Sequence, residues 1–195
     1  MRHKGTMRPA LVVMDMQNGI VERIDPGGAT LARVGAAVTA ARGAGVAVIF
    51  VRVAFRPGYA EASPRNKAFA AISTQADDAF TLDSPATQVH SLLGPAPGEP
   101  VVVKKRVSAF AGSDLEVLLR SLEITHLVLT GIATGGVVLS TVREAADRDY
   151  GLIVLEDCCA DTDPEVHRVL VEKVFPRQAD VMTAALWVQT LTPSR

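Results

Sequence analysis

Short apolar runs recur along the chain, separated by segments that mix apolar and polar residues. The runs are nearly continuous rather than alternating, which is typical of strands in a parallel sheet covered on both faces. They are also rich in β-branched residues, which favour strands. The pattern predicts six strands, in residues 11–14, 46–53, 101–103, 127–129, 152–155 and 181–182.

The segments between these runs have the spacing and the end signals of helices. In residues 30–45, apolar side chains recur at helical spacing until two glycines end the pattern. Ser113 and Glu116 have the spacing of a capping box, in which each side chain bonds the backbone of the other. Asp163 followed by Pro164 indicates a helix start, because proline fits the first helical position.

Strands that alternate with helices favour a doubly wound α/β fold, with three layers and helices on both faces of a mostly parallel sheet. A length of 195 residues suits a single domain, 1–195. We expect residues 1–9 to be flexible. The least regular segment, residues 55–100, predicts a short helix near residues 66–72 and a flap-like insertion over the site.

Composition narrows the class of protein. The formal net charge is −1 with no basic stripe, which argues against a nucleic-acid partner. No apolar run reaches the roughly 18 residues that cross a bilayer, and residues 11–13 are too short for a signal-peptide core. We therefore expect a soluble, cytoplasmic protein with no membrane partner. The apolar content of 48% favours a homo-oligomer.

The two cysteines, Cys158 and Cys159, are neighbours in the sequence. A bond between neighbours would be strained, and two cysteines make no disulfide framework. They follow the predicted strand 152–155, so we expect them to be buried at a strand end. A reactive thiol is the alternative.

Three polar features directly follow predicted strands: Asp15 after the first, Lys104 after the third and residues 131–137 after the fourth. In doubly wound sheets, ligands bind beyond the carboxyl ends of the strands. Each feature alone has an ordinary explanation, because such an aspartate often caps a helix and such a lysine is usually solvated. Their convergence in one crevice favours a functional site.

Three segments, LVVMDMQNGI, VVVKKRVSAF and GIATGGVVLSTVREAADRDY, resemble in this order and spacing the isochorismatase-like superfamily of cysteine hydrolases. The resemblance extends over almost the whole chain. It implies a catalytic aspartate, lysine and cysteine. The aspartate corresponds to Asp15, with Gln17 beside it, and the lysine to Lys104 rather than Lys105. At the position of the cysteine, this chain has Val137.

The covalent route that the resemblance implies needs a nucleophile at position 137. Valine has no proton to lose and no lone pair, so Val137 cannot supply one. Two hydroxyls remain nearby. Thr134 belongs to the motif that carries the resemblance and is expected to be structural, and Ser140 is expected to face along the helix.

The backbone of this loop is expected to contribute to the site by itself. Gly135 and Gly136 predict a sharp turn into a helix that begins near Val137. The resemblance implies a cis peptide bond between Ile132 and Ala133. The amides of Ala133 and Val137 would then form an oxyanion hole.

These residues predict a hydrolase that acts on a small molecule. The resemblance to isochorismatases implies acid–base hydrolysis of a vinyl-ether-type bond, with Asp15 as the acid and Lys104 as its electrostatic partner. Two alternatives remain open: a catalytically inactive small-molecule-binding protein, and an amidase that uses Thr134 or water.

Further expectations concern the ligand. Arg56 and Arg65 are candidates to bind an acidic substrate, and Tyr59 is a candidate for an apolar wall. Residues 55–69 contain no histidine, and the histidines elsewhere lack ligand spacing, so we expect no metal and no cofactor. The expected binding residues are Gln17, Phe110, Ile132, Ala133, Thr134 and Gly136.

Overall fold

The centre of the protein is one six-stranded sheet in the order β3-β2-β1-β4-β5-β6, with all neighbouring strands parallel. The structure is a computed structural model that describes residues 7–75 and 78–191. The strands are β1 (Pro9–Met14), β2 (Ala47–Val53), β3 (Val101–Lys104), β4 (His126–Ile132), β5 (Gly151–Ala160) and β6 (Asp180–Met182).

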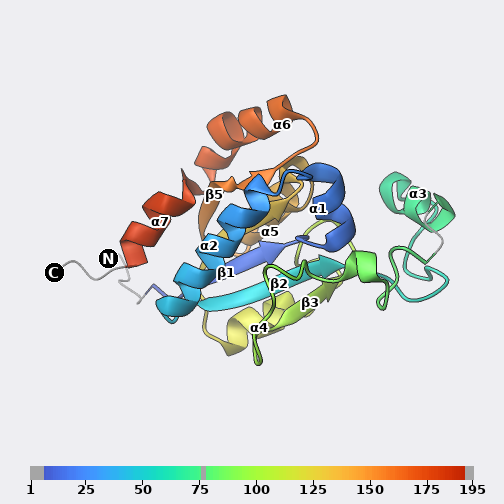
Figure 1. Ribbon diagram of the computed structural model, residues 1–195, viewed down its shortest axis with the longest axis horizontal. Helices are drawn as coiled ribbons and strands as arrows, with labels where there is room; N and C mark the ends of the chain where they lie inside the picture. Colours follow the sequence, from blue (N-terminus) through green and yellow to red (C-terminus); the bar gives the residue numbers. More distant parts are fainter. Residues whose placement is uncertain (1–6, 76–77, 192–195) are drawn as a thin grey trace.

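Helices connect these strands and cover both faces of the sheet (Figure 1). They are α1 (Asn18–Ile24), α2 (Ala29–Gly43), α3 (Lys67–Gln75), α4 (Leu115–Ser121), α5 (Leu139–Asp147), α6 (Pro164–Val169) and α7 (Ala184–Leu191). Shorter helical turns are η1 (Pro85–Thr87), η2 (Thr134–Val138), η3 (Leu170–Val174) and η4 (Phe175–Arg177). The predicted doubly wound α/β fold is confirmed, and each predicted strand lies within an observed one except 46–53, which begins one residue before β2.

The sheet separates two hydrophobic cores because successive residues of a strand point to opposite faces. Leu11 and Val13 of β1 pack with buried residues of α2 and α7. Val12 and Met14 pack on the opposite face with residues of α4 and α5. Figure 1 shows α2 on the near face of the sheet and α5 behind it. Burial on both faces explains why the strands appear in the sequence as continuous apolar runs.

The helix-start signals were correct in one case and wrong in another. The side chain of Asp163 caps α6 by accepting a hydrogen bond from the backbone amide of Glu165, 2.9 Å away. The capping box predicted for Ser113 and Glu116 does not form, because Oγ of Ser113 accepts from the amide of Leu115, 3.2 Å away, instead of from that of Glu116. The carboxylate of Glu116 instead accepts a hydrogen bond from Arg120 one turn later, 2.6 Å away.

The structure also describes the start of β1 and both cysteines. Of the segment 1–9 that was expected to be flexible, residues 1–6 lie outside the described residues. Its last residue, Pro9, is the first residue of β1. Cys158 and Cys159 are free and buried in β5, as expected. Among the helices of the described chain, none has the length and apolar character needed to cross a membrane.

The arrangement of strands places a crevice beyond the carboxyl ends of β1 and β4. Strands β2 and β3 lie on one side of β1, whereas β4, β5 and β6 lie on the other, so the connections diverge there. The helix predicted at residues 66–72 is α3, which projects beyond this edge of the sheet (Figure 1). Segment 55–100 therefore borders the crevice, and its flap-like role stays a prediction.

Candidate active site

The carboxyl ends of β1 and β3 bring a carboxylate and an ammonium group together. Asp15 follows β1 directly, and Lys104 is the last residue of β3. The Nζ atom of Lys104 lies 2.9 Å from Oδ2 of Asp15, and the two side chains are 2% and 8% exposed. These two side chains, which the sequence singled out, form a buried ion pair.

Each N–H donor of the Lys104 ammonium group has an acceptor, and these hydrogen bonds hold the side chain in place. Besides Asp15, its Nζ donates to the carbonyl oxygens of Arg106 and Val107, at 3.0 and 3.1 Å. Lys105 points elsewhere, since its Nζ donates to the carbonyl oxygen of Ala54 at 2.5 Å. The choice of Lys104 over its neighbour therefore agrees with the position of the ion pair.

The two carboxylate oxygens of Asp15 differ, because Oδ2 pairs with Lys104 and Oδ1 does not. The backbone of Asp15 has a φ of 54°, in the left-handed region, and its amide donates to the carbonyl oxygen of Val51 at 2.8 Å. Its Oδ1 atom is buried and has no hydrogen-bond partner among the described residues. Burial raises the pKa of the Asp15 carboxyl, and the Lys104 ammonium opposes this increase. A buried acid with an unused oxygen is suited to bind a ligand and exchange a proton with it.

The third part of the site is the turn from β4 into α5. The peptide bond between Ile132 and Ala133 is cis. The predicted helix start near Val137 is wrong by about one turn, because the π-helical turn η2 already begins at Thr134 and continues into α5.

The glycine that this turn requires is not one of the two predicted. Gly135 and Gly136 do not have a positive φ, whereas Gly131 has a φ of 139°. A Cβ atom on Gly131 would overlap the carbonyl oxygen of Met14. The turn therefore depends on the close approach of β4 to β1 at Gly131.

Two hydrogen bonds anchor η2 to the segment after β5. Oγ1 of Thr134 lies 2.8 Å from Nδ1 of His167, and the amide of Gly135 donates to Oδ2 of Asp161 at 2.6 Å. Thr134 is fully buried. The sequence analysis did not identify His167 and Asp161. The one signal available was their position after β5, the strand that pairs with β4.

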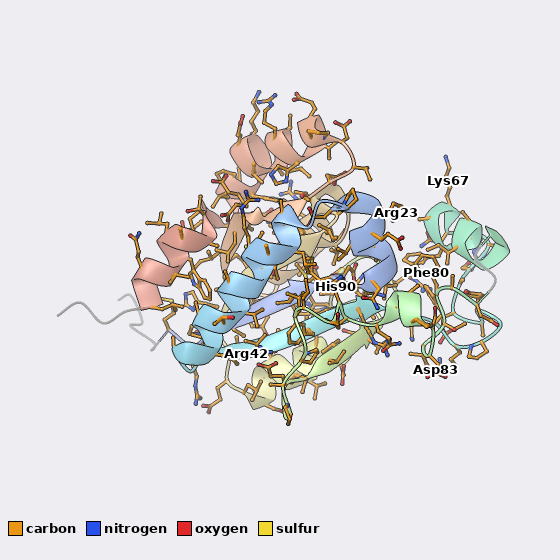
Figure 2. All side chains as sticks on the ribbon, in the orientation of Figure 1. Arg23, Arg42, Lys67, Phe80, Asp83 and His90 are labelled. Atoms are coloured by element: carbon orange, nitrogen blue, oxygen red, sulfur yellow. The ribbon has the colours of Figure 1, made fainter. Side chains whose placement is uncertain are left out.

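A cavity of about 630 Å³ opens above the ion pair. Its walls come from the carboxyl ends of the strands, from α1, from α3 and from residues 79–80. Among the residues that line it, only Asp15, Lys104 and Arg23 have charged side chains, and the others are apolar or glycine. Figure 2 shows Arg23 on α1 and Phe80 facing the space between α1 and α3. The volume and the apolar character are typical of small-molecule sites.

The cavity separates the site residues expected from the sequence into two groups. Those that line it are Asp15, Lys104, Ile132, Ala133, Gly136 and Val137. Gln17, Phe110 and Thr134 do not line it. The carboxamide of Gln17 donates to the carbonyl oxygens of Val53 and Thr87, at 2.9 and 3.0 Å, so it joins β2 to residues 81–90.

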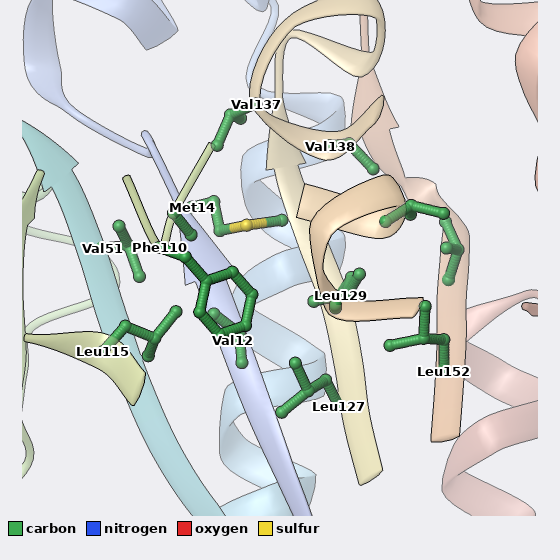
Figure 3. Close-up of a cluster of buried hydrophobic side chains, with 14 of the residues drawn as sticks. Val12, Met14, Val51, Phe110, Leu115, Leu127, Leu129, Val137, Val138 and Leu152 are labelled. Carbon is green, nitrogen blue, oxygen red and sulfur yellow. The ribbon is translucent and has the colours of Figure 1, made fainter. Parts of the chain in front are cut away.

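The remaining side chains proposed for ligand binding also have structural positions. Phe110 belongs to the core cluster that contains Leu115 (Figure 3), and its ring stacks on Tyr150 with centroids 6.1 Å apart. Tyr59 is buried against Phe55. The flap arginines proposed to bind substrate, Arg56 and Arg65, are exposed and lie outside the cavity lining. Sequence reasoning missed Arg23, which does line the cavity.

The distribution of His, Cys, Asp and Glu side chains bears on metal binding. Within residues 7–75 and 78–191, no three His, Cys, Asp or Glu side chains gather as a metal site would require. The expectation that the protein works without metal or cofactor stays a prediction.

The chain is similar to several known proteins. Ureidoacrylate amidohydrolase RutB of Methylobacterium radiotolerans is 32% identical, over 99% of this chain and 90% of that protein. RutB of Stutzerimonas stutzeri is 35% identical, over 80% and 71% respectively. The structure of an isochorismatase family protein from Burkholderia thailandensis superposes with a TM-score of 0.82, at 34% identity over 94% of this chain and 95% of that one. The family model for the isochorismatase domain matches residues 9–185, so the chain belongs to the isochorismatase family.

Proposed function

We propose that this isochorismatase-family hydrolase cleaves a small molecule by acid–base chemistry and forms no covalent intermediate. Asp15 transfers the proton, and Lys104 holds the charge beside it. The observation that carries the proposal is the buried Asp15–Lys104 pair, which lines an apolar cavity and has one carboxylate oxygen with no partner in the described part of the chain. Val137, which also lines this cavity, offers no nucleophilic atom.

The proposed reaction is hydrolysis of a vinyl-ether-type bond. The raised pKa of Asp15 keeps its carboxyl protonated at a higher pH than usual, so it can act as an acid. Asp15 gives its proton to the distal alkene carbon, and the alkene electrons form the new C–H bond. Water adds to the resulting oxocarbenium carbon and returns a proton to Asp15. The hemiketal then breaks into an alcohol and a carbonyl compound.

A second candidate is amide hydrolysis by water, which the two relatives named ureidoacrylate amidohydrolase favour. In this reaction ionised Asp15 takes a proton from water while the water oxygen adds to the carbonyl carbon, and the backbone amides of Ala133 and Val137 bind the developing oxyanion. The C–N bond then breaks, and the carboxyl of Asp15 returns the proton to the leaving nitrogen. Each such donor contributes about 10²–10³ in rate. Thr134 is a poor nucleophile for a covalent version, because it is fully buried and lies outside the cavity lining.

The test is a panel of vinyl ethers and N-carbamoyl amides given to the wild type and to Asp15→Asn. We expect kcat/KM to fall at least about 100-fold, because the amide cannot exchange the proton. Asp157→Asn is the matched control, since Asp157 bonds the amide of Ala184 at 2.7 Å outside the cavity. Full turnover in Asp15→Asn would contradict the proposal, and binding without turnover by the wild type would favour an inactive binding protein.

The pH profile separates the two reactions. If Asp15 is the acid, its protonated form is active, and kcat/KM falls as pH rises through its raised pKa. If Asp15 is the base, its ionised form is active, and kcat/KM rises through the same range. Either limb should disappear in Asp15→Asn.

A further inference from the structure

We infer that Arg23 binds a carboxylate at one end of the ligand, so that the enzyme selects small molecules with an apolar body and one carboxylate. This inference rests on the proposed function only for the identity of the bond that is cleaved. The binding of the carboxylate follows from the cavity itself and can be measured without turnover.

Arg23 lies on the face of α1 that lines the cavity. Ile20, Arg23 and Ile24 all line it, and their spacing of three and four residues places them on one side of the helix. Figure 2 shows Arg23 on the part of α1 that faces α3. Arg23 therefore borders the cavity from α1, whereas the ion pair borders it at the ends of the strands.

Arg23 is the charged group of the lining that the protein itself does not neutralise. Asp15 and Lys104 neutralise each other. The side chain of Arg23 forms no hydrogen bond or ion pair with any described residue. Some exposed arginines are paired, such as Arg56 with Glu61. Arg33 and Arg177 are unpaired within the described chain like Arg23, but they lie outside the cavity lining. Because Arg23 is unpaired among the described residues and also lines the cavity, its donors are available to a ligand that enters there.

A carboxylate suits these donors better than other anions. Guanidinium presents two parallel N–H groups that match a carboxylate in a bidentate arrangement. One arginine neutralises one negative charge, whereas a phosphate dianion would keep an excess charge beside apolar walls. Those walls include Phe69, Ile72 and Phe80, which would contact the body of the ligand.

The test uses two probes of the same shape, 3-phenylpropionate and 3-phenylpropionamide, which differ in charge. Binding is measured by NMR titration of the wild type, Arg23→Gln, Arg23→Lys and Arg33→Gln. In the wild type we expect the carboxylate to bind about three- to tenfold more tightly than the amide. This preference should disappear in Arg23→Gln and persist in part in Arg23→Lys, which keeps the charge but loses the planar fork. Arg33→Gln, an exposed position on α2 outside the cavity, should keep it fully.

The outcomes distinguish this inference from the proposed reaction. Equal affinities in the wild type, a preference that persists in Arg23→Gln, or no binding of either probe would overturn the role of Arg23. If the preference depends on Arg23 but no substrate of the panel is hydrolysed, the inference holds and the proposed reaction fails. Repeating the titration with Asp15→Asn keeps the binding measurement independent of turnover.

Discussion

The two sides of the cavity use their polar groups in opposite ways. On the β1–β3 side, Asp15 and Lys104 are held close together, and one carboxylate oxygen remains without a partner. On the β4–α5 side, Thr134 bonds His167, the amide of Gly135 bonds a carboxylate, and the cavity receives apolar side chains and backbone. One side keeps bonding capacity for a ligand, and the other uses its side-chain polar groups to fix the turn.

This difference explains how the turn persists with a valine at position 137. Its conformation depends on Gly131 and on the two anchors to the segment after β5, and none of these involves the side chain of Val137. The residue at position 137 can therefore change without loss of the turn. Asp15 and Lys104 cannot be replaced in this way, because replacing either residue leaves the charge of the other buried without a partner.

The largest effect on stability should come from breaking the ion pair. Lys104→Met leaves the carboxyl of Asp15 buried without its cation, and we expect the free energy of unfolding at pH 7 to fall by about 3 kcal/mol. Denaturant unfolding measures the loss. Lys105→Met is the matched control and should cost less than about 1 kcal/mol, because the Nζ atom of Lys105 donates to a carbonyl oxygen, lies over the ring of Phe55 and has no carboxylate partner among the described residues.

The pH dependence of this loss has a definite sign. Without Lys104, the folded-state pKa of Asp15 rises further above its unfolded value of about 3.9. Above the unfolded pKa, folding of this variant is therefore coupled to more proton uptake than folding of the wild type, so the deficit grows as pH rises and shrinks near pH 4. A deficit that is the same at both pH values would show that the cost comes from packing instead of charge.

The second prediction concerns the β4 turn. Gly131→Ala should lower the free energy of unfolding by about 3 kcal/mol, because the new Cβ meets the Met14 carbonyl at a φ that side chains rarely adopt. Gly136→Ala is the control, since its Cβ would have ordinary contact with Ala133 at 3.8 Å. A loss for Gly136→Ala as large as that for Gly131→Ala would contradict the assignment of the turn to Gly131.

Particular residues show how far the sequence determines this site. The positions of Asp15 and Lys104 were predictable, because both stand where an apolar run ends and parallel strands share their carboxyl edge. Gln17 and Phe110 lie near the same motifs but have structural contacts, which spacing alone does not reveal. His167 was not found because its contact with Thr134 spans 33 residues.

Arg23 illustrates a signal that was available and unused. Its spacing from Ile20 and Ile24 places it on an apolar helix face, where a charged residue stands out. The fold was easier to predict than the site, since continuous apolar runs and helix spacing each report burial directly. Side-chain partners depend on tertiary contacts that a local pattern does not contain.

The third prediction restores a nucleophile to the cavity. Val137→Cys places a thiol within the helical turn η2, where backbone amides near a helix start favour the thiolate. We expect iodoacetamide to label this variant at least about tenfold faster than the wild type, as measured by mass spectrometry. The wild type is its own control, because burial raises the pKa of Cys159 to about 12 and raises that of Cys158 as well. No labelling of the folded variant would show that position 137 does not face the accessible part of the cavity.

The smallest effect should come from the anchor between Thr134 and His167. Thr134→Val and His167→Phe each remove one side of a partly buried hydrogen bond, and we expect each to cost about 1 kcal/mol in the free energy of unfolding. The two variants share one interaction, so their double variant should cost less than the sum of the single changes by about 0.5–1 kcal/mol. Denaturant unfolding of all four proteins measures this coupling. If the costs simply add, the two side chains do not act as a pair, and Gly135 with Asp161 would be the principal anchor of the turn.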